Sequence, residues 1–127
     1  MRQAVSADSA PAALGPYSQA IIANGFVFCS GTAGIDPATG AVAEGIEAQA
    51  EQALRNLDAI LAAAGASLAT LVKTTIFYQN VGDFAAINAV YARYMPEPPP
   101  ARSAPANVNL PRGLLISIDA IAVLPAA

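Results

Sequence analysis

The hydrophobic pattern of the first third of the chain predicts one β-hairpin. Apolar residues dominate positions 20–23 and 26–30, on either side of an Asn-Gly pair. Such a pair favours a type I′ turn, because both central residues of that turn take positive φ. Residues 1–18 show no clear periodicity, and their second half, punctuated by proline and glycine, is predicted as a loop.

Residues 46–64 carry the periodicity of an amphipathic helix. Apolar side chains recur there every three or four residues, and Gly65 is placed to end the helix. The polar side chains lie largely off the apolar stripe: Gln49, Gln52, Arg55, Asn56 and Asp58. The pattern therefore predicts a helix that packs through one face, after a polar, glycine-rich connection over residues 31–45.

A strand and a second helix follow. Residues 71–78 are rich in β-branched and aromatic side chains and are predicted as a central strand. Asp83 is a suitable N-cap for a helix over residues 84–94, whose apolar positions again follow helical spacing. Asn88 lies at the margin of that apolar stripe.

The last part of the chain predicts two strands, over residues 102–108 and 114–123, joined by a short turn as an antiparallel pair. Alternation in the last strand places one wholly apolar set on the core face. Ser117 and Asp119 share the opposite face with apolar neighbours. That face indicates an interface or a pocket, or equally well the solvated side of an edge strand.

The order of elements predicts a single α+β domain over residues 1–127. Each helix links two strands, so right-handed crossovers place both helices on one face of a mixed β-sheet. The other face is left bare. Charged residues make up only 12% of the chain and apolar residues 55%, against about 25% charged in an ordinary domain. A domain of this size cannot bury so much apolar surface alone, so we expect a homo-oligomer.

The amino-acid composition limits the partners and the catalytic groups that the protein can have. A net charge of −3 and a pI near 4.6 argue against nucleic-acid binding. No long apolar run or N-terminal signal pattern indicates a membrane, so a cytoplasmic protein is expected. The chain has no histidine, and Cys29 is its one cysteine, which excludes Cys/His metal sites and histidine-dependent catalysis within one chain. Any chemistry must therefore use carboxylates, hydroxyls, an arginine, backbone groups and water.

Arg102 is the most distinctive candidate for binding. Three prolines at positions 98–100 precede it, separated from it by Ala101, and such a run is stiff, extended and unable to form helix. A planar guanidinium held in this way suits bidentate capture of a carboxylate. The alternative is a strand-end arginine paired with a surface acid.

Several short motifs occur in a particular order and spacing along nearly the whole chain from Ala10. They are Gly15-Pro16-Tyr17-Ser18-Gln19-Ala20, Cys29-Ser30-Gly31, Asp36-Pro37-Ala38-Thr39-Gly40, Gln49, Gln52-Ala53-Leu54-Arg55-Asn56-Leu57, Val72-Lys73-Thr74-Thr75, Phe84-Ala85-Ala86-Ile87-Asn88, Tyr91, Pro99-Pro100-Ala101-Arg102-Ser103 and Leu110-Pro111. In these motifs the chain resembles the Rid/YjgF family of reactive-intermediate (2-enamine and 2-imine) deaminases.

The resemblance implies a chorismate-mutase-like α+β fold and a homotrimer with clefts between subunits. It also implies hydrolysis of 2-imino acids to 2-oxo acids and ammonia, without metal or cofactor. By matching position, Arg102 would bind the substrate carboxylate, helped by the backbone at Ala104. The other residues implied to line the cleft are Tyr17, which we also count among the catalytic candidates, Ser30, Gly31 and Asn88.

Two positions depart from the family pattern. The residues after Arg102-Ser103 are Ala104 and Pro105, where the family usually has Cys or Thr after Arg-Ser. The family's water-holding glutamate falls on Ser117, which we keep as a catalytic candidate. The family's next acid is retained as Asp119, a candidate for substrate binding.

Three functions remain open on the sequence. The first is an imine or enamine deaminase, with a small carboxylate as substrate. The second is a carboxylate-binding member without efficient catalysis or with an altered substrate, because Ser117 replaces the glutamate. The third is the ribonuclease or translation-inhibitor activity attached to some relatives, which the acidic, histidine-free composition disfavours.

Overall fold

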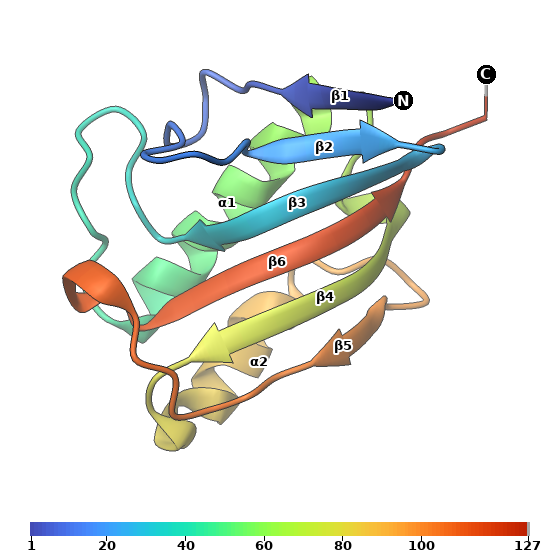
Figure 1. Ribbon diagram of the computed structural model, residues 1–127. Helices are drawn as coiled ribbons and strands as arrows, with labels where there is room; N and C mark the ends of the chain where they lie inside the picture. Colours follow the sequence, from blue (N-terminus) through green and yellow to red (C-terminus); the bar gives the residue numbers. More distant parts are fainter. Residues whose placement is uncertain (127) are drawn as a thin grey trace.

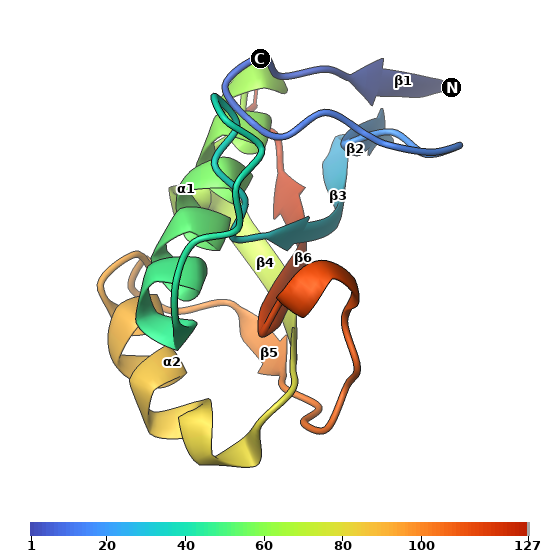
Figure 2. The ribbon, with the colours of Figure 1, turned by 90° about the vertical axis from the view of Figure 1, so that its left-hand side faces the viewer.

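The computed structural model describes residues 1–126, which form one mixed sheet backed by two helices. The strands are β1 (Arg2–Val5), β2 (Ala20–Ala23), β3 (Phe26–Ala33), β4 (Leu71–Tyr78), β5 (Ala101–Ser103) and β6 (Ile116–Val123). The helices are α1 (Ile46–Ala63) and α2 (Phe84–Ala92), with short 3₁₀ turns at Leu68–Thr70, Val81–Asp83 and Pro111–Gly113. The sheet order is β1-β2-β3-β6-β4-β5. Both helices lie on the same face of the sheet (Figures 1 and 2), so the predicted α+β fold is confirmed.

The predicted hairpin is present. Asn24 and Gly25 have φ of 52° and 80°, and β2 pairs antiparallel with β3. β1 was not predicted. It pairs antiparallel with β2, but only Val5 of its four residues is buried, so its sequence carries no alternating pattern.

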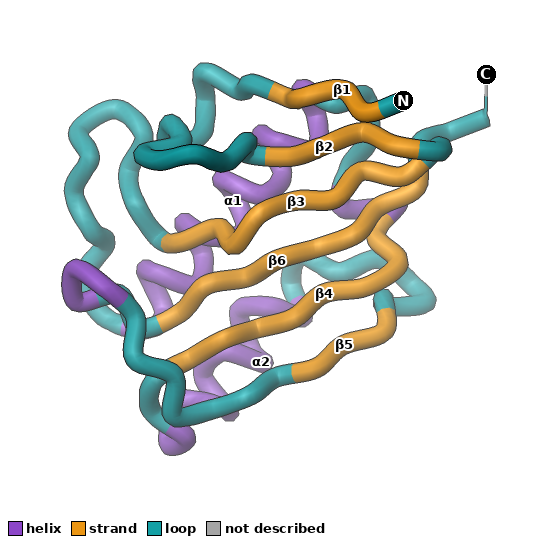
Figure 3. The backbone as a smooth tube through the Cα atoms, viewed as in Figure 1, coloured by secondary structure: helices purple, strands orange, loops and turns teal. Residues whose placement is uncertain are grey.

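The predicted antiparallel pairing of residues 102–108 with 114–123 is wrong. β5 is three residues long and pairs parallel with β4, with Thr74 opposite Arg102. β6 instead lies between β3 and β4 and runs antiparallel to both, as Figure 3 shows. Pro105 has no N–H to give to a sheet. Its carbonyl accepts from the Tyr78 N–H, and the Tyr78 carbonyl accepts from the Val108 N–H, so this segment closes over the end of β4.

The helices differ from prediction at their ends. α1 ends at Ala63, with Gly65 at φ 87°, in the left-handed conformation expected of a residue that ends a helix. Asp83 occupies the N-cap position of α2, but its side chain makes no capping hydrogen bond. A 3₁₀ turn over Val81–Asp83 leads into the helix instead.

Two polar side chains of α1 are buried, contrary to the expectation that they lie off the packed face. Gln49 is 3% exposed and Asn56 is 1% exposed. Gln49 Oε1 accepts from the Leu115 N–H at 2.8 Å. Asn56 Nδ2 donates to the carbonyls of Ala33 and Ile35 at 2.9 and 2.8 Å. These amides satisfy main-chain groups at the ends of β3 and β6, which helical periodicity cannot reveal.

The core lies between the helices and the sheet. Its largest fully buried side chains include Leu54, Leu57 and Leu61 of α1 and Ile116 and Ile118 of β6. The helix-free face of the sheet carries exposed apolar side chains, since Phe26, Phe28 and Val123 are 37%, 43% and 39% exposed. We call this the open face, formed by Ile21, Phe26, Phe28, Ile121 and Val123. In the described part of the chain, no helix is long and apolar enough to cross a membrane.

Candidate functional site

A β-bulge in β3 forms one wall of the candidate site. Cys29 pairs with Ala120 and Thr32 with Ile118, so two residues, Ser30 and Gly31, stand opposite one residue of β6. The Ser30 N–H donates to the carbonyl of Gln19 at 3.0 Å, and Ser30 Oγ donates to the carbonyl of Ser18 at 2.6 Å. The bulge is therefore fixed to the segment that follows Tyr17.

Ser117 lies directly beside this bulge. It is half-buried in the middle of the sheet, opposite Ala33 on β3 and Phe77 on β4. A Cβ built on Gly31 would lie 2.8 Å from Ser117 Oγ. Position 31 therefore leaves room for the side chain at position 117 only because it is glycine.

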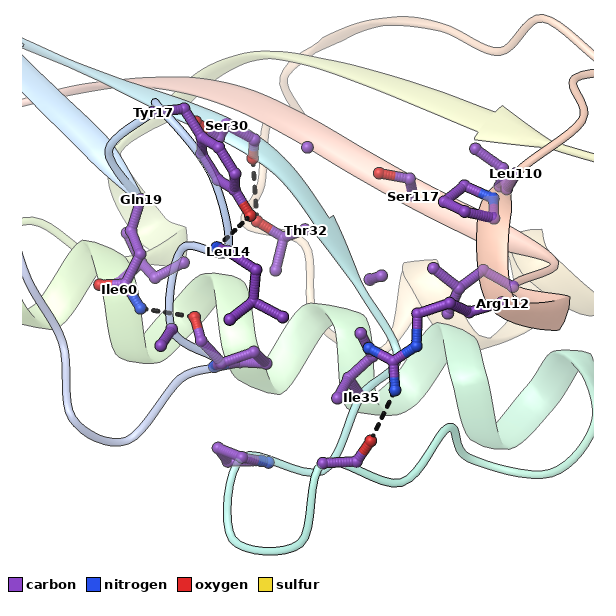
Figure 4. Close-up of a pocket in the computed structure, with 18 of the residues that line it drawn as sticks. Leu14, Tyr17, Gln19, Ser30, Thr32, Ile35, Ile60, Leu110, Arg112 and Ser117 are labelled. Atoms are coloured by element: carbon purple, nitrogen blue, oxygen red, sulfur yellow. Dashed lines mark hydrogen bonds between the residues drawn. The ribbon is translucent and has the colours of Figure 1, made fainter.

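A cavity of about 650 Å³ opens next to these residues. Tyr17, Ser30, Gly31 and Ser117 all line it, so the structure brings together four of the predicted site residues. Figure 4 shows Tyr17, Ser30 and Ser117 around the cavity. They come from the loop before β2, the β3 bulge and β6. Tyr17 is 53% exposed, and its hydroxyl accepts a long hydrogen bond, 3.4 Å, from the Leu14 N–H.

Gln19 positions the N-terminal side of the cavity, a role that the sequence analysis missed. Its Oε1 accepts from the Ala7 N–H at 2.6 Å. Its Nε2 donates to the carbonyls of Ala7 and Pro11 at 3.2 and 2.7 Å. The side chain is buried, so it holds the loop that carries Tyr17. Its place in the Gly-Pro-Tyr-Ser-Gln-Ala motif was the available signal.

Arg112 forms the opposite wall and was also missed. It has φ 61°, a left-handed conformation uncommon outside glycine. Its Nη2 donates to the carbonyl of Gly40 at 2.9 Å, which ties the turn before β6 to the loop after β3. Asp36 and Arg112 are the charged residues among those lining the cavity in the described chain.

Arg102 lies in a second, separate group. Its Nη1 donates to Asn88 Oδ1 at 2.8 Å. Its guanidinium carbon lies 5.0 Å from the centre of the Tyr91 ring and 5.5 Å from that of Phe84, within the range of cation–π attraction. Within residues 1–126 no carboxylate forms an ion pair with Arg102. The guanidinium is thus oriented and exposed, with donors left for a ligand.

The two groups do not meet within one chain. Arg102 and Asn88 line a shallow depression of about 500 Å³, which shares no lining residue with the larger cavity. Ala104 is half-buried against the core. Asp119 lies opposite Thr75 of β4, outside the lining of both hollows.

Cys29 and Glu51 have shifted pKa values but do not line the cavity. Burial and the nearby carboxylate of Asp119 raise the pKa of the Cys29 thiol to about 12, so it stays protonated at neutral pH. A hydrogen bond from Tyr94 and the guanidinium groups of Arg55 and Arg93 lower the pKa of Glu51, a half-buried residue of α1. No cluster of His, Cys, Asp or Glu in the described chain could hold a metal ion.

Fold and site together define a small α+β protein with a cavity of ligand-binding size beside a strand bulge. A sequence model of the family described as Endoribonuclease L-PSP matches residues 7–124. The Arabidopsis thaliana protein named Reactive Intermediate Deaminase A, chloroplastic, is 49% identical over 124 residues, which are 97% of this chain and 66% of that protein. The Salmonella typhimurium protein named 2-iminobutanoate/2-iminopropanoate deaminase is 44% identical, over 97% of this chain and 98% of that protein.

Solved structures agree with the sequence matches. The crystal structure of RidA from a Psychrobacter species superposes with a TM-score of 0.93 at 42% identity, covering 96% of this chain and 99% of that one. The chain therefore belongs to the Rid/YjgF family, and the expected family fold is confirmed.

Proposed function

We propose that this protein hydrolyses 2-imino acids to 2-oxo acids and ammonia. The observation that carries the proposal is Arg102, whose guanidinium is oriented by Asn88, stacked on aromatic rings and free of acidic partners in the described chain. Such a group suits a substrate carboxylate. Relatives 40–49% identical that are named for deamination of reactive intermediates or of 2-iminobutanoate and 2-iminopropanoate support the reaction type.

The reaction needs little from the protein. A protonated imine is already electrophilic, so positioning it beside a water molecule supplies much of the catalysis. Water adds to C2, and one of its protons passes to the nitrogen. The C–N bond of the resulting N-protonated carbinolamine then breaks while the hydroxyl loses its proton, and the 2-oxo acid and ammonia leave. Ser117 can hold the water by a hydrogen bond, although a neutral hydroxyl cannot accept its proton at neutral pH.

A homotrimer would complete the site. Arg102 and the larger cavity lie in separate hollows of one chain, so Arg102 of one subunit would face the cavity of the next. The open face, with Phe26 and Phe28 exposed, supplies apolar surface of the kind that subunits bury. As part of this proposal, the protein acts in the cytoplasm, needs no metal or cofactor, and binds neither nucleic acid nor membranes.

A second candidate is a carboxylate-binding protein without efficient catalysis. Ser117 favours it, because the family's glutamate is replaced by a residue that cannot act as a general base. In this case the protein would bind 2-oxo or 2-imino acids at Arg102 and release them unchanged.

One experiment separates the candidates. 2-Iminopropanoate is generated in situ by an amino acid oxidase, and its decay is followed with wild type, Arg102→Ala and the control Arg55→Ala. Arg55 is an exposed arginine of α1 paired with Glu51. Deamination predicts faster decay with wild type and Arg55→Ala only. Unchanged decay, together with thermal stabilisation of the wild type by 2-oxo acids, would establish the binding function instead.

A further inference from the structure

Tyr91 of α2 links the buried core to the guanidinium of Arg102. Its hydroxyl shares a buried hydrogen bond of 2.6 Å with Thr74 Oγ1. Its ring centre lies 5.0 Å from the guanidinium carbon of Arg102, within the range of cation–π attraction. We propose that Tyr91 is a positioning residue, whose ring holds the Arg102 guanidinium in the orientation that receives a carboxylate. The proposal rests on the proposed function of Arg102 in substrate binding.

One face of α2 presents three side chains to Arg102. Phe84, Asn88 and Tyr91 follow helical spacing, so they lie on the same side of the helix. The Phe84 ring centre lies 5.5 Å from the guanidinium carbon, and Asn88 Oδ1 accepts from Arg102 Nη1. The helix therefore supplies two aromatic rings and one hydrogen-bond acceptor to a single guanidinium.

The hydroxyl end of Tyr91 is fixed to the sheet. Tyr91 and Thr74 are both buried. Thr74 lies on β4 directly opposite Arg102, in the parallel pairing of β4 with β5. The strand that holds the tyrosine hydroxyl is thus the strand that pairs with the one carrying the arginine. These contacts form a closed circuit from Thr74 through Tyr91 to Arg102 and back across the strand pair.

Phe84, the other ring near the guanidinium, lacks such an anchor. It is exposed and stacks on the ring of Tyr78, with 5.9 Å between the ring centres. Stacking holds this ring by surface contact alone, whereas Tyr91 also has a directional hydrogen bond. Tyr91 is therefore the ring whose removal should free Arg102 most.

Arg102 needs support of this kind because of where it lies. It is exposed on β5, a three-residue strand at the edge of the sheet. Immobilising a long side chain on binding costs about 2- to 10-fold in affinity. Contacts already made in the free protein remove part of that cost. Asn88 takes one N–H donor of the guanidinium, so its other donors remain for the carboxylate.

The first test measures the affinity for pyruvate by calorimetry. Tyr91→Leu removes the ring and should weaken binding by about 2- to 10-fold, the cost of immobilising a freed arginine. Tyr94→Leu is the matched control, because the Tyr94 hydroxyl donates to Glu51 of α1, and it should keep the wild-type affinity. Equal affinities of Tyr91→Leu and wild type would overturn the proposal.

Tyr91→Phe separates positioning from a purely structural role. It keeps the ring beside Arg102 but leaves Thr74 Oγ1 without its buried partner, so thermal stability should fall. The affinity for pyruvate should nevertheless stay at the wild-type value. If Tyr91→Phe loses as much affinity as Tyr91→Leu, the residue acts through the stability of the fold, and the proposal is overturned.

NMR of the arginine side chains tests the same point without a ligand. In wild type, the Nε–Hε group of Arg102, assigned with Arg102→Lys, should be more ordered than those of the exposed Arg55 and Arg93. In Tyr91→Leu its order should fall to their level, and its ring-current shift should decrease. An Arg102 group that is as mobile as Arg93 in wild type would overturn the proposal. Absence of pyruvate binding by the wild type would refute the proposed function, whereas this comparison would still decide whether Tyr91 orients Arg102.

Discussion

Gly31 and Ser117 compete for one space, since a Cβ on Gly31 would lie 2.8 Å from Ser117 Oγ. The contact joins the β3 bulge to the start of β6, at the position where the resemblance to the family implies a water-holding glutamate. Any side chain at position 117 therefore reaches the cavity over the bare Cα of Gly31. The two positions should behave as one unit in mutagenesis.

Gly31→Ala should displace the Ser117 hydroxyl with little loss of thermal stability, because that hydroxyl can rotate away. We expect kcat/KM to fall by about 10-fold or more, since small misplacements in a site are costly. The check is a double-mutant cycle with Ser117→Ala, in which the second change should add little to the first. Fully additive losses would show that the two residues act independently.

Ser117→Glu should raise the rate on 2-iminopropanoate. A positioned general base contributes about 10²–10⁴-fold, and Gly31 leaves space for the longer side chain. Asp119→Asn should change the rate little, because Asp119 lies outside the cavity lining. Fast hydrolysis by the wild type that is lost in Asp119→Asn would instead mean that the catalytic acid has moved to position 119.

Asn88→Ala should weaken substrate binding by about 2- to 10-fold, as expected for loss of one hydrogen bond worth roughly 0.5–1.5 kcal/mol. The Asn88 amide oxygen accepts from Arg102 at 2.8 Å, so its removal frees the guanidinium to turn. The effect should appear in KM more than in kcat. A loss confined to kcat would place Asn88 at the reacting atoms instead.

Asn56→Leu should lower the free energy of unfolding by several kcal/mol, because each buried carbonyl left unpaired costs about 1–3 kcal/mol. The carbonyls of Ala33 and Ile35 both depend on Asn56. Urea denaturation measures the change. Gln52→Leu is the matched control, because Gln52 donates only to the Asn56 side chain. Equal effects of the two variants would contradict this role for Asn56.

Alkaline pH should destabilise the fold through Cys29. Its pKa of about 12 in the folded protein lies above the ordinary value of 9.0, so the unfolded chain loses the thiol proton first. The stabilisation is complete below pH 9.0 and declines as the pH rises toward about 12. Cys29→Ala should flatten this decline relative to wild type. An unchanged pH profile would contradict the assigned burial of the thiol.

Regular periodicity explains which elements could be predicted from the sequence. The β2–β3 hairpin, both helices and the core face of β6 each repeat a burial pattern over several residues. β1 and β5 are short edge strands with mostly exposed residues, so they leave no such pattern. The pairing of β5 with β4 depends on a crossover through α2, which local sequence does not encode.

Hydrophobic periodicity predicted less of the candidate site than of the fold. Alternation placed Ser117 on the face opposite the core. Its contact with Gly31 depends on a bulge in β3, a strand that pairs with β6 but lies far from it in the sequence. Polarity suggested that Gln49 and Asn56 face solvent, because their main-chain partners lie far along the chain. Resemblance to the family, rather than periodicity, brought Tyr17 and Asn88 into consideration.

Subunit complementation tests the central claim, a deaminase site shared between chains, most directly. Arg102→Ala removes the proposed carboxylate contact, and Gly31→Leu fills the space beside Ser117. Each variant alone should hydrolyse 2-iminopropanoate slowly. After the two are unfolded, mixed and refolded together, some sites combine an intact Arg102 with an intact cavity, and the rate of imine decay should recover in part. A mixture no faster than its separate components, measured beside an active wild type, would contradict a site shared between subunits.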